Sequence, residues 1–136
     1  MIHAPVLRHG RVIFTTLIPS GDVCEAGGSG WVMELDAATG GRLDYTPVDT
    51  NDDNLFNPED LVDIDGDGKG DVYVSGFQPK DGGIPTPPAM LEDPTTYNTD
   101  NPREFKYTGT SKGGVDLITE KNNPWSNTRY SWREVH

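Results

Sequence analysis

The sequence contains one cysteine, Cys24, and no long apolar run. A single thiol excludes an intrachain disulfide. In an exported protein Cys24 can be buried and unreactive, which we expect, free, or paired with another chain. No segment reaches the ~20 apolar residues that a membrane-spanning helix needs, and no signal peptide is recognisable. If the protein is exported, we expect its signal to lie outside this chain, which would then be a piece of a longer protein.

Positive charge is also scarce, with 11 Lys and Arg against 22 Asp and Glu and a formal net charge of −11. This balance argues against nucleic acids and anionic membrane surfaces as partners. Hydrophobic residues make up only 33% of the 136 residues, whereas Gly (16) and Pro (11) are frequent. That profile indicates short strands joined by many turns, and the length suits a single domain over residues 1–136.

The acidic residues gather in one stretch, residues 49–71, which holds eight aspartates, one glutamate and three asparagines against a single lysine. Like charges at this density cost stability unless a cation lies among them. Oxygen-rich side chains of this kind favour a hard cation, and the sequence therefore predicts bound Ca²⁺. The alternative is a solvated acidic turn that binds nothing specific.

The first part of this stretch, residues 49–60, has the spacing of a twelve-residue calcium loop. Such a loop supplies side-chain oxygens at positions 1, 3 and 5, a main-chain carbonyl at 7 and a carboxylate at 12. Position 6 is Asn54 instead of Gly, which is acceptable because Asn enters the left-handed region more easily than most residues. The predicted ligands are Asp49, Asn51, Asp53, Leu55 and Asp60.

A second acidic loop, residues 63–71, has the pattern D-x-D-G-D-G-x-G-D. Its three glycines let the backbone turn tightly around an ion. Residues 61–62 and 72–74 on either side resemble strands, so the loop is not part of a helix–loop–helix sensor. The predicted ligands are the side chains of Asp63, Asp65, Asp67 and Asp71 and the main-chain carbonyl of Lys69.

Strand-forming residues recur along the rest of the chain, and no segment shows sustained helical periodicity. We expect a hairpin of residues 5–8 and 11–18 around His9-Gly10, and an irregular or extended proline-rich loop over residues 80–102. The fold class is therefore all-β, with six to eight short antiparallel strands. Further strands are expected at residues 31–35, 43–45, 72–77, 104–107, 115–120 and 129–135.

Several stretches share one family pattern: residues 10–22 with Cys24, 27–36, 39–43, 49–60, 82–84, 106–107, 111–114 and 130–134. Together they resemble the C-terminal part of the β-propeller domain of PilY-type proteins, the type IV pilus tip-associated adhesins and assembly factors. The second acidic loop and the proline-rich stretch depart from that family pattern.

This resemblance implies a terminal blade portion of a propeller, an extracytoplasmic location reached through the periplasm, and a place at the pilus tip or cell surface. It also implies contact with minor pilins, adhesion to host or abiotic surfaces, and calcium-dependent control of pilus extension and retraction. The calcium role of the family would fall on Asp49, Asn51, Asp53 and Asp60.

Three functions are alternatives to the pilus module. A calcium-stabilised surface adhesin module of integrin-blade type differs from the pilus module only in its partner. A dockerin is disfavoured, because Asp60 and Asp63 leave no room for a helix between the loops. The turn Leu35-Asp36-Ala37 suggests a propeller dehydrogenase, but no nucleophile motif accompanies the histidines, so we predict no enzyme. His3 and His9 are expected to be ordinary surface residues.

Overall fold

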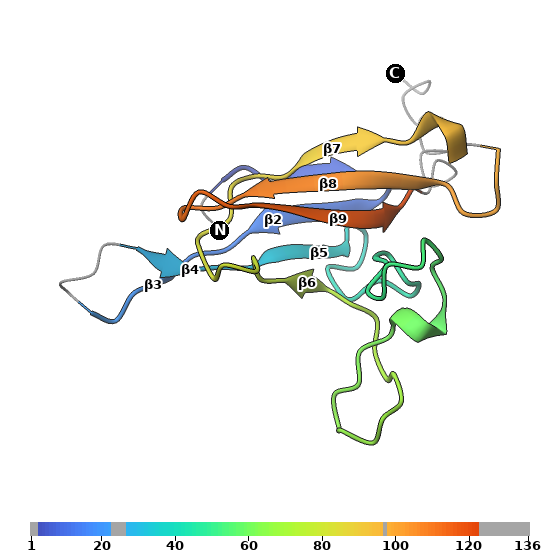
Figure 1. The fold of residues 1–136 in the computed structure, drawn as a ribbon, viewed down its shortest axis with the longest axis horizontal. Coiled ribbons are helices and arrows are strands. Elements are labelled where there is room, and N and C mark those ends of the chain that lie inside the picture. The colour runs from blue at the N-terminus through green and yellow to red at the C-terminus, as the bar shows by residue number, and fades with distance from the viewer. Residues whose placement is uncertain (1–2, 23–26, 97, 123–136) are drawn as a thin grey trace.

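Figure 1 shows a computed structural model of the chain, which describes residues 3–22, 27–96 and 98–122. These residues form nine short strands and two single-turn 3₁₀ helices, with every strand pair antiparallel. The predicted all-β class is confirmed, but the described residues form more strands than the six to eight expected. No helix within these ranges is long and apolar enough to cross a membrane. Cys24, His136 and the predicted strand 129–135 lie outside the described residues.

The first sheet has four strands in the order β1-β2-β5-β6. The predicted hairpin forms its edge, with His9 and Gly10 as the two-residue turn at φ angles of 51° and 77°. Two consecutive positive φ values are the signature of a type I′ turn, whose twist matches that of paired strands. The strands are β1 (Val6–Arg8), β2 (Arg11–Thr15), β5 (Val32–Asp36) and β6 (Gly76–Phe77).

The second sheet has three strands, β7 (Ala89–Glu92), β8 (Arg103–Gly109) and β9 (Val115–Lys121). Strand β7 and the 3₁₀ turn η2 (Pro94–Thr96) lie inside the proline-rich stretch, which is therefore partly ordered into a sheet edge.

A short two-stranded ribbon lies outside the two larger sheets and pairs β3 (Ile18–Pro19) with β4 (Gly28–Ser29). The strand predicted at residues 43–45 does not form, and of residues 72–77 only β6 and the isolated bridge between Val62 and Val72 are paired.

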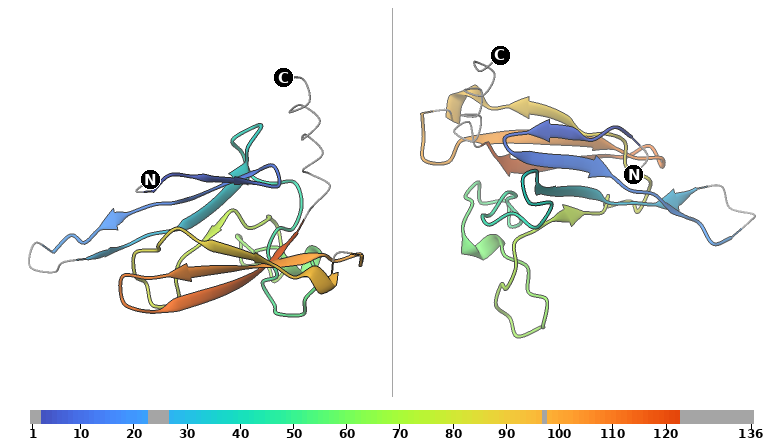
Figure 2. Two further views of the ribbon diagram at one scale, coloured as in Figure 1. Left: turned by 90° about the horizontal axis from the view of Figure 1, so that it is seen from above. Right: turned by 180° about the vertical axis from the view of Figure 1, so that it is seen from behind.

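The two larger sheets lie as separate layers, one above the other (Figure 2, left). Few apolar side chains are buried in the described chain: Ile13, Val32, Leu43 and Val48. Alternation along β8 instead places Glu104, Lys106 and Thr108 inward, and all three are fully buried. The space between the sheets is therefore filled largely by charged side chains.

The outer faces of both sheets carry apolar side chains. On the first sheet Leu7 is 67% exposed, and Phe14, Trp31 and Met33 line a shallow apolar hollow. On the second, the register puts Ala89, Tyr107 and Leu117 in one outward row across the three strands, with Leu91 58% exposed beside them. The usual polarity of a two-layer sheet protein, apolar inside and polar outside, is inverted here.

Candidate metal loops and the buried ionic layer

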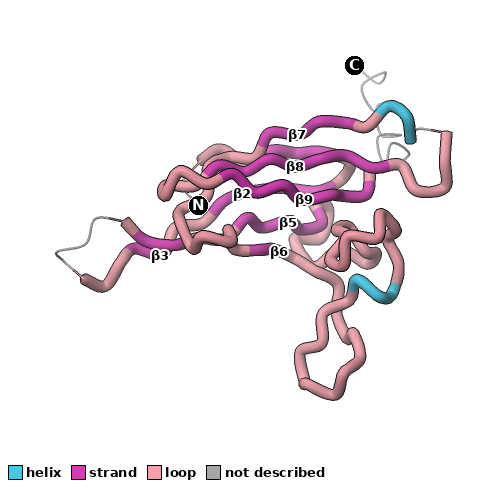
Figure 3. The backbone as a smooth tube through the Cα atoms, viewed as in Figure 1, coloured by secondary structure: helices cyan, strands magenta, loops and turns pink. Residues whose placement is uncertain are grey.

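The acidic stretch lies in the long connection from β5 to β6, at one end of the two sheets (Figure 3). Loop 63–71 extends away from the sheets in Figure 1. Its two ends are held together by the bridge between Val62 and Val72, in which Val62 N donates to Val72 O at 2.8 Å. Gly70 packs so closely on Leu61 that a Cβ atom there would lie 2.4 Å from the Leu61 Cβ.

Three of the predicted ligands in loop 63–71 come together. One carboxylate oxygen each from Asp63, Asp65 and Asp71 lies within 4.8 Å of the other two. Asp67 is not in this group; its Oδ1 accepts from Lys69 N at 2.8 Å. The loop thus gathers three anionic oxygens at one point, and oxygen atoms are the ligands that hard cations take.

Backbone amides hold Asp63 in place. Its two oxygens accept from Gly68 N at 2.8 Å and from Gly66 N at 2.6 Å, and these bonds lower the pKa of Asp63. Both glycines have positive φ values, 81° at Gly66 and 88° at Gly68, which bend the backbone around the carboxylate. Asp63 therefore stays ionised at moderately acidic pH.

Loop 49–60 is wound differently, around the carboxylate of Asp49, which is buried. Asp49 Oδ2 accepts from Asn54 N at 2.7 Å, and Asn51 Oδ1 accepts from Asp53 N at 3.0 Å. Asn54 has a φ of 63°, which confirms the prediction that it occupies the left-handed region. Leu55 N donates to Asp53 Oδ1 at 2.7 Å.

Asp60 closes this loop from within the protein. It is 1% exposed, and its two oxygens accept from Thr50 N at 2.7 Å and Asn57 N at 3.0 Å. It thereby completes a capping box on the 3₁₀ turn η1 (Pro58–Asp60). Within the described chain, Asp49, Asp53 and Asp60 do not form a three-carboxylate group of the kind found in loop 63–71.

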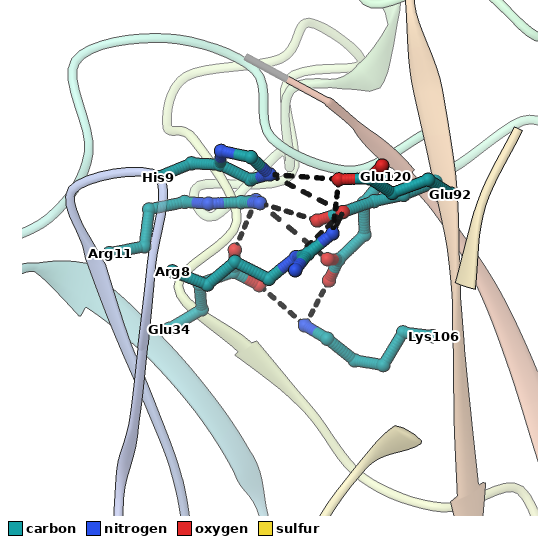
Figure 4. A network of polar contacts seen from close by, with 8 residues as sticks. Arg8, His9, Arg11, Glu34, Glu92, Lys106 and Glu120 are labelled. Carbon is teal, nitrogen blue, oxygen red and sulfur yellow. Dashed lines mark hydrogen bonds and ion pairs between the residues drawn. The ribbon is translucent and has the colours of Figure 1, made fainter. Parts of the chain in front are cut away.

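The second cluster of charges was not predicted from the sequence, and it lies between the sheets (Figure 4). Arg11 on β2 pairs with Glu34 on β5 and with Glu104 on β8, the latter at 2.8 Å. Lys106 on β8 pairs with Glu34 at 2.6 Å and with Glu120 on β9. We call these five residues the ionic layer.

Charges in the ionic layer are balanced. Burial acts against the charged form of each group, but its partners keep Arg11, Lys106 and Glu34 ionised: they raise the pKa of both cations and lower that of Glu34. Contacts with His9, Arg8 and Arg11 outweigh the burial of Glu104 and lower its pKa to about 2. Burial and the nearby Glu34 charge raise the pKa of Glu120 to about 8. Two cations thus face two anions and one protonated carboxyl at neutral pH.

The ionic layer continues to the rim of the sheets through the β1–β2 turn. Arg8 Nη2 lies 2.6 Å from Glu104 and 2.9 Å from Glu92. The prediction that His9 is an ordinary surface residue is wrong: it is 6% exposed, with Nε2 3.6 Å from Glu104 Oε2. The turn conformation at His9-Gly10 directs the imidazole inward toward the second sheet (Figure 4).

A sequence signal for the ionic layer was present in the alternation of β8, where Glu104 and Lys106 alternate with Phe105 and Tyr107. Such a strand has one charged and one aromatic face, and the general rule places the aromatic face inside. Here the charged face is inside, because Arg11 and Glu34 on the facing sheet provide opposite charges.

Comparison with known proteins gives one short match. Over 41 residues the chain is 51% identical to a type IV pilus biogenesis factor PilY1 homolog of Xylella fastidiosa, a segment covering 29% of this chain and 3% of that protein. No family model matches the chain, and no solved structure does. The match supports a relation to PilY-type proteins over that segment.

Proposed function

We propose that this chain is a calcium-binding β module of a type IV pilus biogenesis protein, forming part of a β-propeller in a longer polypeptide. In this role it works outside the cytoplasm, at the pilus tip or cell surface, and contacts minor pilins during pilus assembly and adhesion. It binds partners and catalyses no reaction. The observation that carries the proposal is the convergence of Asp63, Asp65 and Asp71 in a loop whose base is closed by backbone pairing.

The acidic loops support the calcium part of the proposal. Ca²⁺ takes six to eight oxygen ligands, and loop 63–71 offers three carboxylates at one point, with Asp67 and the Lys69 carbonyl nearby in the chain. Within the described residues, no Lys or Arg side chain forms an ion pair with the three clustered aspartates. A calcium ion would supply the missing positive charge and fix the projecting loop.

The inverted polarity of the sheets supports the propeller part. Blades of a propeller pack against one another through both faces, so each blade needs two faces fit for burial. Exposed apolar rows on the outer side of both sheets, including Leu7 and Leu117, meet that need. The matched relative is much longer than this chain, which leaves ample polypeptide to cover these faces.

Calcium titration by calorimetry tests the proposal directly. The wild-type chain is expected to bind Ca²⁺, and a hundredfold excess over the dissociation constant would stabilise it by about 2.7 kcal/mol. The double variant Asp63→Asn, Asp65→Asn is expected to lose binding at this loop. The control Asp44→Asn removes one exposed aspartate outside both loops and should bind as the wild type does.

A second double variant, Asp49→Asn with Asp53→Asn, tests calcium binding at loop 49–60 separately. If neither double variant loses bound calcium relative to the wild type, the two loops are not calcium sites and the calcium part of the proposal is wrong. A pull-down with purified minor pilins, with and without chelator, then distinguishes a pilus module from a surface adhesin module of integrin-blade type. Capture that is independent of Asp63 and of chelation would separate the pilin contact from the metal.

A further inference from the structure

A second group of potential metal ligands lies at the rim of the ionic layer. One ligand atom each from His9, Glu92 and Glu104 lies within 4.8 Å of the other two. His9 comes from the β1–β2 turn of the first sheet, whereas Glu92 and Glu104 face each other across β7 and β8 of the second. These three residues, the rim cluster, therefore bring both sheets to one point.

His9 is the informative member of the rim cluster. Its side chain is 3% exposed, and neither Nδ1 nor Nε2 has a hydrogen-bond partner within the described chain. Leaving a buried polar group unsatisfied is costly, so such a group calls for an explanation. Nε2 points at the two carboxylates, 3.6 Å from Glu104 Oε2 and 4.0 Å from Glu92 Oε1 (Figure 4).

The two glutamates already share a cation. They are direct cross-strand neighbours, a position in which like charges destabilise a sheet. Arg8 Nη2 lies between them, at 2.6 Å from Glu104 and 2.9 Å from Glu92. The Arg8 side chain is 25% exposed. Because its guanidinium group is carried on a long flexible stem, the group can move into solvent while the backbone stays in place.

We propose that His9, Glu92 and Glu104 bind a Zn²⁺ ion that takes the place of the Arg8 guanidinium between the two sheets. In a tetrahedral zinc site with bonds of about 2.0–2.2 Å, ligand atoms lie roughly 3.3–3.6 Å apart. The His9–Glu104 separation of 3.6 Å already fits, and Glu92, whose side chain is 40% exposed, must approach His9 Nε2 from its present 4.0 Å. Water completes the coordination.

The ligand set distinguishes this metal from calcium. Imidazole nitrogen suits zinc and its transition-metal neighbours, whereas calcium takes oxygen ligands in larger number. The rim cluster and loop 63–71 thus select different ions and share no residue. Bound zinc would tie the β1–β2 turn to β7 and β8, and so lock the two sheets together at one edge.

Zinc titration in saturating Ca²⁺ tests the inference, because the calcium keeps the acidic loops from taking up zinc. A chromophoric zinc indicator should report one equivalent bound by the wild type. His9→Gln is expected to weaken binding by at least about tenfold, since removing even an outer-shell partner costs 10–100-fold. His3→Gln and His136→Gln, which change the other two histidines, should bind as wild type does.

Arg8→Met should change zinc affinity in the opposite direction to His9→Gln, since it removes the competing cation and keeps the apolar stem. This variant should bind zinc more tightly than wild type, and Co²⁺ in place of Zn²⁺ should give the visible absorption of a tetrahedral site. If Arg8→Met fails to bind either metal, or if His9→Gln binds as tightly as wild type, the inference is wrong. Asp63→Asn should leave zinc binding unchanged, which separates this result from the fate of the calcium proposal.

Discussion

The ionic layer and the acidic loops are both crowded with carboxylates, but they are neutralised in different ways. In the ionic layer Glu34 and Glu104 face Arg11 and Lys106, all of them buried between the sheets. In loop 63–71 the carboxylate of Asp63 accepts hydrogen bonds from the backbone amides of Gly66 and Gly68. The first region is complete within the chain, whereas the second is suited to a cation from solution. Buried opposite charges must be supplied by the fold, but exposed ones can be left to an ion.

Removing a cation from the ionic layer should have the largest effect. Arg11→Met leaves Glu34 and Glu120 with Lys106 as their close cationic partner and Glu104 with Arg8, and breaking a buried pair in this way costs about 3–5 kcal/mol. Urea unfolding should therefore show a large loss of stability. The control Arg42→Met, at an exposed arginine, should stay within about 0.5 kcal/mol of wild type. If Arg11→Met lowers the free energy of unfolding no more than the control does, the ionic layer does not contribute to the stability of the fold.

The second-largest effect is expected in the pH dependence of stability, which should come from the ionic layer. Glu120 has a pKa near 8 in the folded protein against 4.5 as the ordinary value, so the folded chain holds a proton that the unfolded chain has lost. Its contribution to stability is full below pH 4.5 and is lost as the pH rises through 8, by up to about 1.4 kcal/mol per pH unit.

The variant Glu120→Gln isolates this effect, because an amide mimics the protonated acid and does not titrate. Measured by urea unfolding from pH 4.5 to 9, its stability relative to wild type should rise with pH and level off above 8. Glu59→Gln, at an exposed glutamate on η1, serves as the control. Parallel pH profiles for wild type and Glu120→Gln would contradict a protonated Glu120.

A change in the packing of the acidic loop should have a smaller effect on the whole protein. In Gly70→Ala the new methyl group would meet Leu61 Cβ at 2.4 Å and Leu61 O at 2.8 Å, and overpacking of this kind costs about 1–3 kcal/mol. The base of loop 63–71 should open, and calcium affinity should fall with it. Gly41→Ala, where the nearest atom would be 3.5 Å away, is the matched control. Equal calcium affinity in both variants would mean that closure at Gly70 does not shape the loop.

The smallest effect is expected at Asn54, where calcium loops usually have glycine. At a φ of 63°, Asn54→Ala should cost about 1 kcal/mol, because a Cβ without a compensating polar group is disfavoured there. Asn54→Gly should cost less than Asn54→Ala. Thermal unfolding of the two variants gives the comparison, and a more stable alanine variant would show that the left-handed conformation is not required.

Local chemistry in the sequence was enough to predict the β1–β2 hairpin, the conformation of Asn54 and the strands β5, β8 and β9. Each depends on neighbouring residues: a His-Gly turn, an Asn in a tight loop, or a run of β-branched and aromatic side chains. Strand β7 was not predicted, because prolines surround it and only pairing with β8 makes it a strand. The predicted ligand Asp67 lies outside the three-carboxylate group for a similar reason: spacing alone does not fix which oxygens converge.

The sequence by itself determined that this chain is acidic, rich in turns and built from alternating strands. Only the tertiary structure decided which face of each strand is buried. Alternation gives β8 two faces, one with Glu104 and Lys106 and one with Phe105 and Tyr107, but does not determine which face is buried. Arg11 and Glu34 determine it, because they come from distant parts of the chain to lie opposite β8, and a buried charge is stable only beside its counter-charge.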